Sequence, residues 1–541
     1  MTICLAARAC AAAFLSAAVL AQERELLRTG WTFAPGARDA RPDEAAYRAI
    51  AVPGTFEDLL GEAFDGSGWY RRTLDLRAAR GARVRIEFTA AATEATVYWN
   101  GTEVGRHLGG WTPFRVELPA ASTGDEGLLE VFLDEKVGHN TQGFHPIIQP
   151  HFGGLWQDVV LCVDRAPVLD RFSLLTFGDG ATGALRCEAT VLPGPHPSDD
   201  LEVAVVVRDG AHEVARAAAR AVPGTPVTLT VPVPEVRRWS PRAPHLYRVA
   251  VEVRAGGETV DRVERRLGFR DVRADGHRLL LNGEPLSVRG MLHWGYEPPR
   301  FAPNPDPEVW RREMEDLRAR GFNLVKACLW LPPRSFYETA EEVGMLVWQE
   351  YPTWHPKLTA EYRDELAREF HEFFLHDRSH ACVPFRSLTC ETGHSADLAV
   401  VRALYDDAKA TVPQTLVVDD SSWIEWLRVF DFYDDHPYGN NSWWPGKLRQ
   451  LREYIAAREA KPLLLGECIA ADTWFDLAAW RARHGGGTRW FAPRCLGDQP
   501  RFEAWLEREF GAETLAQLQP SSHAYALRMR KYQIERLRLD L

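Results

Sequence analysis

The stretch FRSLTCETG, residues 385–393, ends a short apolar run in a single glutamate, Glu391, flanked by small residues. The stretch KPLLLGEC, residues 461–468, repeats this pattern and carries Glu467 near its end. A carboxylate at the end of a buried strand loses hydration free energy unless it is paired or takes part in chemistry. Either glutamate alone could simply mark where a strand meets solvent. As a pair on converging strands, they are typical of a general acid/base and a nucleophile.

The region around these stretches alternates strands with helices. Apolar segments predict seven strands, near residues 286–293, 323–328, 345–350, 383–391, 415–420, 430–436 and 462–467. Seven such units in succession predict a (β/α)8 TIM barrel over residues 272–541, in which functional residues lie at the carboxyl ends of the strands. No eighth strand is recognisable, so we expect either a truncated barrel or one closed by an atypical element.

Two all-β units precede this region. Residues 22–165 alternate apolar and polar positions, with a strong hairpin signal at Asn100-Gly101, and predict a β-sandwich of the jelly-roll type. Residues 166–271 have the length and turn pattern of an immunoglobulin-like sandwich. Within them, RRWSPRAPHLY (residues 237–247) contains prolines that exclude a central strand and predict a shaped loop.

The amino terminus and the composition indicate where the protein works. Residues 1–21 hold an apolar run after Arg8 and are typical of a secretory signal peptide, so we expect a secreted or periplasmic protein. The net charge of −11 argues against nucleic acid or an anionic membrane surface as partner, and no stretch is long enough to span a membrane. The cysteines outside the leader are widely spaced and predict neither a disulfide scaffold nor a metal site. No cofactor is expected.

Tryptophan is abundant, with 19 residues, many of them in turn-like stretches. Exposed indole rings suit sugar binding, because an apolar pyranose face stacks on a flat ring. Large β-sandwich cores also bury tryptophan, and we assign about half of the residues to that role.

Several segments occur in an order that resembles glycoside hydrolase family 2, the group of β-galactosidases, β-glucuronidases and β-mannosidases. They are WYRRTL, VYWNGTEVGRHLGGWTPF, FGGLWQDVVL, RRWSPRAPHLY, GFRDV and LLLNGEPLSVRGMLHW. The resemblance implies a sugar-binding jelly roll, an immunoglobulin-like domain and a catalytic barrel, in that order. It also implies retaining hydrolysis with Glu391 as acid/base and Glu467 as nucleophile. Glu391 would then hold a proton, with a pKa raised by ionised Glu467 nearby.

Two positions depart from the family pattern. Cys390 stands where the family usually has asparagine in contact with the sugar 2-hydroxyl, and a thiol is a weak hydrogen-bonding partner. Lys326 stands where the family often has arginine, so the charge is kept and the bidentate fork is lost. Both remain candidate substrate contacts.

Other strand ends supply further candidates. Tyr438 matches a family tyrosine that bonds the nucleophile, although it could simply shape a loop with the preceding proline. His293 could bond a sugar hydroxyl or serve as a structural histidine. Glu350 is either a carboxylate of the sugar site or, more simply, the salt-bridge partner of Lys326.

The remaining candidates for substrate contact are His436, Trp330 and Trp474. The run Asp434-Asp435-His436 has ligand spacing too nonspecific to predict a metal site.

Three functions compete. The first is a secreted exo-β-glycosidase that acts on oligosaccharide or polysaccharide. The second is a catalytically weak relative that binds carbohydrate, as Cys390 and the missing strand would favour. The third, a lectin-like adhesion protein, leaves the β/α region unexplained. The sequence does not identify the sugar, although the absence of an Asn-x-Lys pair after Glu467 argues against glucuronate.

Overall fold

The computed structural model describes residues 22–120, 125–136, 138–143, 151–198, 200–438, 443–468, 477–485, 495–517, 524, 528 and 531–535. The predicted signal peptide lies outside these residues, so it stays a prediction. Among the described residues, no helix combines the length and apolar character needed to cross a membrane.

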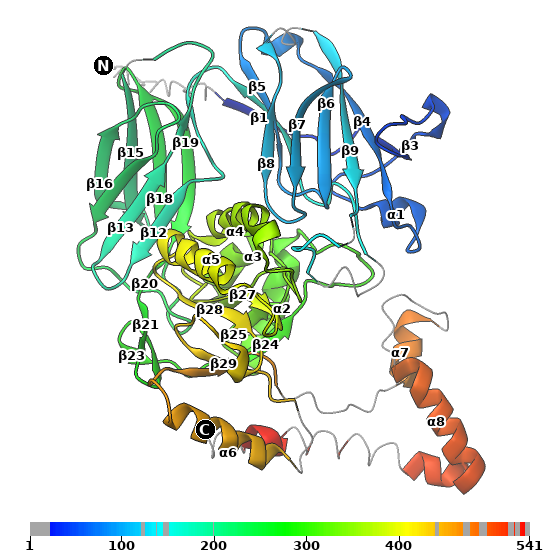
Figure 1. Ribbon diagram of the computed structural model, residues 1–541. Coiled ribbons are helices and arrows are strands. Elements are labelled where there is room, and N and C mark those ends of the chain that lie inside the picture. The colour runs from blue at the N-terminus through cyan, green and yellow to red at the C-terminus, as the bar shows by residue number, and fades with distance from the viewer. Residues whose placement is uncertain are drawn as a thin grey trace, which may run out of the picture.

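The first part of the chain forms two facing sheets, drawn in blue and cyan in Figure 1. One has the strand order β1-β10-β5-β8 and the other β3-β2-β4-β9-β6-β7. The predicted hairpin at Asn100-Gly101 is confirmed, because both residues have positive φ (48° and 79°) between β6 and β7. The elements are β1 (Gln22–Leu26), β2 (Thr32–Pro35), β3 (Arg48–Ala49), α1 (Phe56–Leu60), β4 (Ser67–Asp75), β5 (Arg83–Phe88), β6 (Glu94–Trp99), β7 (Thr102–Leu108), β8 (Phe114–Glu117), β9 (Glu126–Asp134) and β10 (Val159–Asp164).

A second two-sheet sandwich follows, with the strand orders β17-β13-β12-β20 and β16-β15-β18-β19. Its core is built from alternating valines and leucines, which the two sheets point inward. Its strands are β11 (Val168–Leu169), β12 (Leu175–Asp179), β13 (Ala184–Ala189), β14 (Val191–Leu192), β15 (Leu201–Asp209), β16 (His212–Arg220), β17 (Val227–Pro232), β18 (Tyr247–Ala255), β19 (Glu258–Leu267) and β20 (Phe269–Arg270). A three-stranded sheet then precedes the α/β region in the chain. Its strands are β21 (Val272–Asp275), β22 (Arg278–Leu281) and β23 (Glu284–Pro285).

The third part alternates strands and helices, as predicted. Five strands form one parallel sheet in chain order, β24-β25-β26-β27-β28, and β29 pairs in parallel with β30. All seven predicted strands are confirmed, several with shorter bounds. The elements are β24 (Gly290–His293), α2 (Pro307–Ala319), β25 (Leu324–Ala327), α3 (Arg334–Val343), β26 (Leu346–Glu350), α4 (Arg363–Asp377), β27 (Phe385–Cys390), α5 (Leu398–Thr411), β28 (Leu416–Ser421), β29 (Tyr433–Asp435), α6 (Trp444–Ala456), β30 (Leu463–Leu465), α7 (Leu477–His484) and α8 (Cys495–Phe510).

The predicted loop at residues 237–247 lies between β17 and β18 of the second sandwich and packs against the α/β region. Trp239 is fully buried in the α/β core, and its indole N–H donates to the carbonyl of Glu341 at 2.9 Å. The Asn282 amide in turn donates to the Trp239 carbonyl at 2.9 Å. The loop is therefore a docking element between two folding units.

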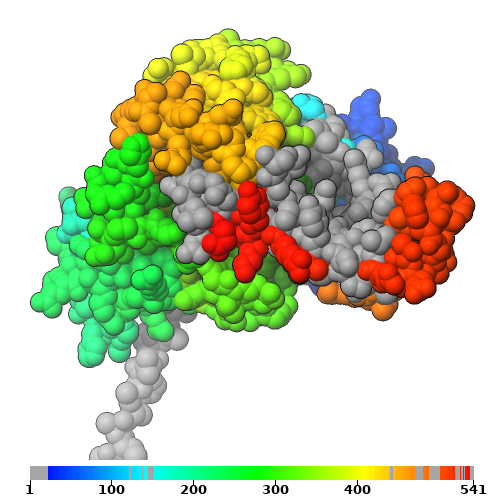
Figure 2. All heavy atoms as spheres, turned by 90° about the horizontal axis from the view of Figure 1, so that it is seen from below, coloured from blue at the N-terminus to red at the C-terminus, as the bar shows by residue number. Residues whose placement is uncertain are grey.

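α6 and the red segment near the carboxyl terminus lie along the lower edge of the α/β region, whereas α7 and α8 stand apart from it (Figure 1). Seen from below, residues 531–535 lie near the centre of that face (Figure 2), where the Trp444 indole donates to the carbonyl of Gln533 at 3.3 Å. This contact joins the final described residues to α6.

Candidate active site

Polar side chains gather where the parallel strands end. Lys326 lies in β25, Glu350 is the last residue of β26, and Cys390 is the last residue of β27, directly before Glu391. His436 follows β29, and Glu467 lies just beyond β30. The carboxyl ends of parallel strands share one edge, which explains how residues up to 141 positions apart in the sequence (467 − 326) meet.

The two predicted carboxylates are close together. Carboxylate oxygens of Glu391 and Glu467 and a ring nitrogen of His436 all lie within 4.8 Å of one another. The Tyr438 hydroxyl donates to Glu467 Oε2, which is the contact predicted for it. Glu467 is 7% exposed and Tyr438 is 40% exposed, so the tyrosine lies at the solvent side of the pair.

The backbone at Glu391 is unusual. Its φ is +51°, in the left-handed region that residues with a Cβ seldom adopt. Its N–H donates to the Ser421 carbonyl at 3.0 Å, and the next N–H, that of Thr392, donates to Asp420 Oδ1 at 3.1 Å. These bonds to β28 hold the turn that follows β27. Strained backbone of this kind is frequent where a side chain must be aimed for function.

Lys326 is the central cation of the cluster. Its Nζ lies 2.7 Å from Glu350 Oε2, 3.9 Å from Glu467 Oε1 and 2.8 Å from Ser421 Oγ. The expected Lys326–Glu350 salt bridge is therefore confirmed. Burial opposes the charge of Lys326, but the two glutamates outweigh burial and raise its pKa, so the ammonium stays charged beside Glu467.

His436 binds the predicted acid/base directly. Its Nδ1 lies 3.0 Å from Glu391 Oε1, and its Nε2 lies 3.1 Å from Ser421 Oγ, which donates to Asp434 Oδ2 at 2.6 Å. Burial raises the pKa of Asp434 to about 7. Burial lowers the pKa of His436, but Glu391 and Asp434 outweigh this effect and raise the pKa overall.

The prediction that the pKa of Glu391 is raised is wrong. Burial does raise it, but the hydrogen bonds from His436 and from the Trp354 indole, at 3.2 Å, outweigh burial and lower the pKa. The reason is that hydrogen bonds to a carboxylate stabilise its charged form. Both pKa shifts favour a charged pair of carboxylate and imidazolium.

Two thiols line the base of the cluster. Cys390 Sγ lies 4.0 Å from Glu467 Oε1, and Cys328 Sγ lies 3.8 Å from the same oxygen and 3.0 Å from Glu350 Oε1. Burial raises the pKa of both thiols, which are therefore neutral. Cys390 thus contacts the predicted nucleophile from the position where a family 2 enzyme usually has asparagine.

Trp330 and His293 are placed differently from the prediction that they bind sugar. Trp330 is 1% exposed, and its ring packs against Trp310 and Phe336 with centroids 5.7 and 5.4 Å away. A sugar stacks on an open face of an indole ring, and a side chain that is 1% exposed offers none, so Trp330 is a packing residue. His293 Nδ1 accepts from the Gly295 N–H at 2.9 Å and its Nε2 lies 3.2 Å from Glu313, as in the structural alternative.

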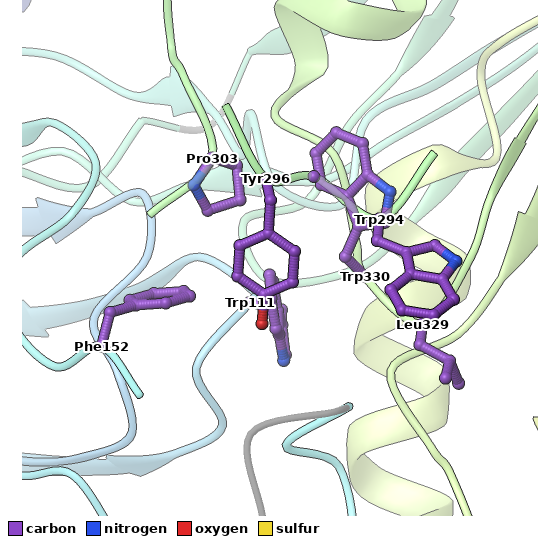
Figure 3. A pocket seen from close by; sticks show the side chains of 8 residues that line it. Trp111, Phe152, Trp294, Tyr296, Pro303, Leu329 and Trp330 are labelled. Atoms are coloured by element: carbon purple, nitrogen blue, oxygen red, sulfur yellow. The ribbon is translucent and has the colours of Figure 1, made fainter. Parts of the chain in front are cut away.

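Figure 3 shows the surroundings of Trp330. Aromatic side chains from the first sandwich and from the α/β region line a cavity of about 10 Å³, which is about the minimum that one water molecule requires. The lining residues are Trp111, Phe152, Trp294, Gly295, Tyr296, Pro303, Leu329 and Trp330. This cavity is an aromatic junction between two parts of the chain and is too small for a sugar.

The sequence interpretation missed three members of the site and included one that is not described. Trp474 lies outside the described residues. Cys328 and Ser421 were not predicted, although both occur at strand ends and the rule that located Glu391 would have located them. Trp354 was not singled out among the tryptophans of turn-like stretches, and its indole N–H donates to Glu391 at 3.2 Å.

Comparisons with known proteins point to one family of glycosidases. Residues 178–270 match the family model described as Glycosyl hydrolases family 2. A β-galactosidase from Thermoanaerobacter pseudethanolicus is 26% identical over 355 residues, and a β-glucuronidase from Paenibacillus borealis is 25% identical over 449 residues. The predicted relationship to glycoside hydrolase family 2 is confirmed.

The sequence matches cover only part of this chain and of its relatives, whereas the structural matches cover most of each chain. They cover 63% of this chain and 47% of the β-galactosidase, and 73% of this chain and 70% of the β-glucuronidase. A Ruminococcus gnavus β-glucuronidase in complex with D-glucuronic acid superposes with a TM-score of 0.70 at 18% identity, covering 84% of each chain. A family 2 β-galacturonidase from Eisenbergiella tayi gives 0.71 at 20% identity, covering 84% of this chain and 83% of that one. The multidomain fold with its β-sandwiches is therefore shared.

Proposed function

We propose that this protein is a retaining glycoside hydrolase that cleaves terminal β-glycosidic bonds. The observation that carries the proposal is the approach of Glu391 and Glu467 to within 4.8 Å. Retaining enzymes hold their two carboxyl groups about 5–5.5 Å apart, whereas inverting enzymes leave about 6.5–9.5 Å for a water molecule.

In this mechanism Glu467 attacks the anomeric carbon and forms a covalent glycosyl-enzyme, which water then hydrolyses. Lys326 Nζ and the Tyr438 hydroxyl both contact the carboxylate of Glu467 that attacks. Glu391 protonates the leaving oxygen. His436 Nδ1, 3.0 Å from Glu391 Oε1, can supply the proton that Glu391 passes to the leaving oxygen.

We further propose that the seven parallel β/α units form the wall of a TIM barrel, with the site at the carboxyl ends of its strands. The relatives in solved structures bind D-glucuronic acid and galacturonate, and the sequence relatives include a β-galactosidase. A galactoside or a uronide is accordingly the substrate class to test first.

Nitrophenyl β-glycosides of galactose, glucuronic acid, galacturonic acid and mannose provide the test. We expect turnover of at least one of them, and a loss in kcat of about 10²–10⁴-fold for Glu391→Gln. Glu467→Gln should stop the glycosylation step altogether. The matched control is Glu453→Gln, an exposed glutamate on α6, which should leave kcat unchanged.

The second candidate function is carbohydrate binding without efficient catalysis, which Cys390 at the position of the usual asparagine favours. Calorimetry with the same sugars separates the two. Saturable binding by a wild-type protein that hydrolyses none of the glycosides would defeat the hydrolase proposal and support the binding protein.

A further inference from the structure

A second group of ionisable side chains, none of them part of the proposed active site, belongs to the first sandwich, in segments next to α1, β4 and β9. Asp65 lies between α1 and β4, Glu135 directly follows β9, and His151 belongs to the segment that leads back to β10. One ligand atom from each of the three lies within 4.8 Å of the other two. Three separate parts of the chain thus converge on one point.

The distances within this group are too long for hydrogen bonds. His151 Nδ1 lies 3.7 Å from Asp65 Oδ2 and 3.8 Å from Glu135 Oε1. Hydrogen bonds of this kind are about 2.7–3.2 Å long. Two atoms that share a Zn²⁺ ion at about 2.0–2.2 Å each are separated by less than about 4.4 Å, so the observed gaps match a bent ligand–metal–ligand arrangement.

The buried carboxylates of the group have few hydrogen-bond donors. Glu135 is 3% exposed, and among the described residues no donor hydrogen-bonds either of its Oε atoms. Glu57 of α1 is 2% exposed; its Oε1 accepts no hydrogen bond from the described part of the chain, and its Oε2 accepts a long one from the Gly153 N–H at 3.4 Å. A buried carboxylate without a donor or a cation is costly, and native proteins rarely leave one in that state.

Several carboxyl groups meet at this point. Glu135 and Glu57 are buried, and Asp65 belongs to the same group as Glu135. Within the described residues, no lysine or arginine forms a salt bridge with either glutamate. Either protons or a cation must neutralise this group.

We propose that Asp65, Glu135 and His151, supported by Glu57, form a binding site for a divalent transition-metal cation, Zn²⁺ or Mn²⁺. Carboxylates combined with one imidazole suit these ions, whereas Ca²⁺ and Mg²⁺ prefer oxygen ligands alone. The Asp65 side chain is 53% exposed and gives the ion a path from solvent. The bound ion would tie α1, the end of β9 and the 151–156 segment together.

The test uses the full-length chain after treatment with EDTA and dialysis. ZnCl₂, MnCl₂, CaCl₂ and MgCl₂ are added separately, the bound metal is counted by mass spectrometry after gel filtration, and Tm is recorded. We expect Zn²⁺ or Mn²⁺ to bind and to raise the Tm. Asp65→Asn and Glu135→Gln should each weaken this binding at least about 10-fold.

Glu62→Gln is the matched control, because Glu62 is an exposed glutamate of the same loop as Asp65 and lies outside the group. It should bind metal as the wild type does. If Glu135→Gln fails to fold, the half-exposed Asp65 supplies the decisive variant. No glycosidase assay enters this test, so its result is independent of the proposed function.

Three results would overturn the proposal. The first is equal metal content in wild type, Asp65→Asn and Glu135→Gln. The second is tighter binding of Ca²⁺ or Mg²⁺ than of Zn²⁺ and Mn²⁺. The third is a wild type that binds no metal while Glu135→Gln raises its Tm, which would show that the carboxyls hold protons instead.

Discussion

At the scale of single residues, the proposed active site depends on a buried cation. Lys326 is 2% exposed and lies between Glu350, which is fully buried, and Glu467. An ion pair of this kind adds little net stability compared with an apolar pair, but removal of one partner leaves the other charged and buried.

Lys326→Met should therefore lower the free energy of unfolding by about 3–5 kcal/mol, measured by urea denaturation. The control is Arg320→Met, which breaks an exposed pair with Asp316 at 2.8 Å and should cost about 0.5 kcal/mol or less. Adding Glu350→Gln to Lys326→Met should recover part of the loss. A cost for Lys326→Met as small as that of the control would contradict the account of the buried ion pair.

The contact between His436 and Glu391 predicts a pH dependence. The raised pKa of His436 means that its contribution to stability is complete below the unfolded value of about 6.5 and is lost as the pH rises through the folded value. The lowered pKa of Glu391 means that its contribution is complete above about 4.3 and is lost as the pH falls through the folded value.

Stability measured for wild type and for His436→Gln should accordingly differ most near about pH 5.5, between these limits, and the difference should shrink toward alkaline pH. Chemical denaturation at several pH values gives both curves. A difference that grows with rising pH would show that the imidazole is neutral in the folded protein.

At the scale of elements, the loop of residues 237–247 contributes through one side chain. Trp239 fills a place in the α/β core and bonds the Glu341 carbonyl, although it belongs to the second sandwich. Glycine at position 268 leaves room for it, since a Cβ there would come within 2.8 Å of Trp239 Cβ.

Trp239→Ala should cost about 3–5 kcal/mol in the free energy of unfolding, as expected for a large buried aromatic residue. Trp239→Phe should cost less, because it keeps much of the buried area and loses the hydrogen bond. Val222→Ala, at a side chain that is 62% exposed in the same sandwich, should stay within about 0.5 kcal/mol of wild type. Equal effects at Trp239 and Val222 would rule out a docking role for the loop.

The elements also show how far sequence reasoning reaches. All seven strands were located, because their apolar runs are short, are bounded by turn residues and alternate with longer helical segments, a combination that favours buried strands. The sixth was predicted to begin near Phe430, but it begins at Tyr433, because Phe430 forms an antiparallel bridge to Val418 instead. The pattern of apolar residues is the same whether Phe430 belongs to the sixth strand or forms a separate bridge, so the pattern alone could not distinguish these two arrangements.

The site was predictable where it depended on strand ends and unpredictable where it depended on side-chain direction. Glu391 and Glu467 follow from their positions after strands. The bond between Glu391 and His436 joins residues 45 positions apart and depends on the positive φ at Glu391, which the sequence does not reveal. Trp330 was misassigned because a tryptophan at a strand end looks the same whether its ring is covered or open.

At the scale of the whole molecule, the first sandwich docks on α4 through histidines and glutamates. His139 Nε2 lies 2.8 Å from Glu369 Oε1, and Thr141 Oγ1 donates to Glu369 Oε2 at 2.9 Å. A second contact joins His107 Nε2 to Glu372 at 3.1 Å. Glu369 is 1% exposed, so the junction excludes water around its carboxylate.

Glu369→Ala should cost about 1–3 kcal/mol, because it removes the buried carboxylate that His139 Nε2 and the Thr141 hydroxyl both contact. Hydrogen exchange should become faster in α4 and in residues 138–143, and remain unchanged in the second sandwich. Glu361→Ala, an exposed position just before α4, serves as the control. Unchanged exchange across α4 in Glu369→Ala would mean that this contact does not hold the two parts together.

The free thiols have a consequence for measurement. Cys162, Cys187, Cys328, Cys382 and Cys390 are unbonded and buried in different parts of the fold, two of them beside Glu467. An alkylating reagent can reach such a sulfur only when the surrounding structure opens, so the rate of modification at each one reports the local opening free energy. Each of the three parts of the chain contains at least one such thiol. A single labelling experiment with peptide mapping can therefore compare the local opening of all three parts.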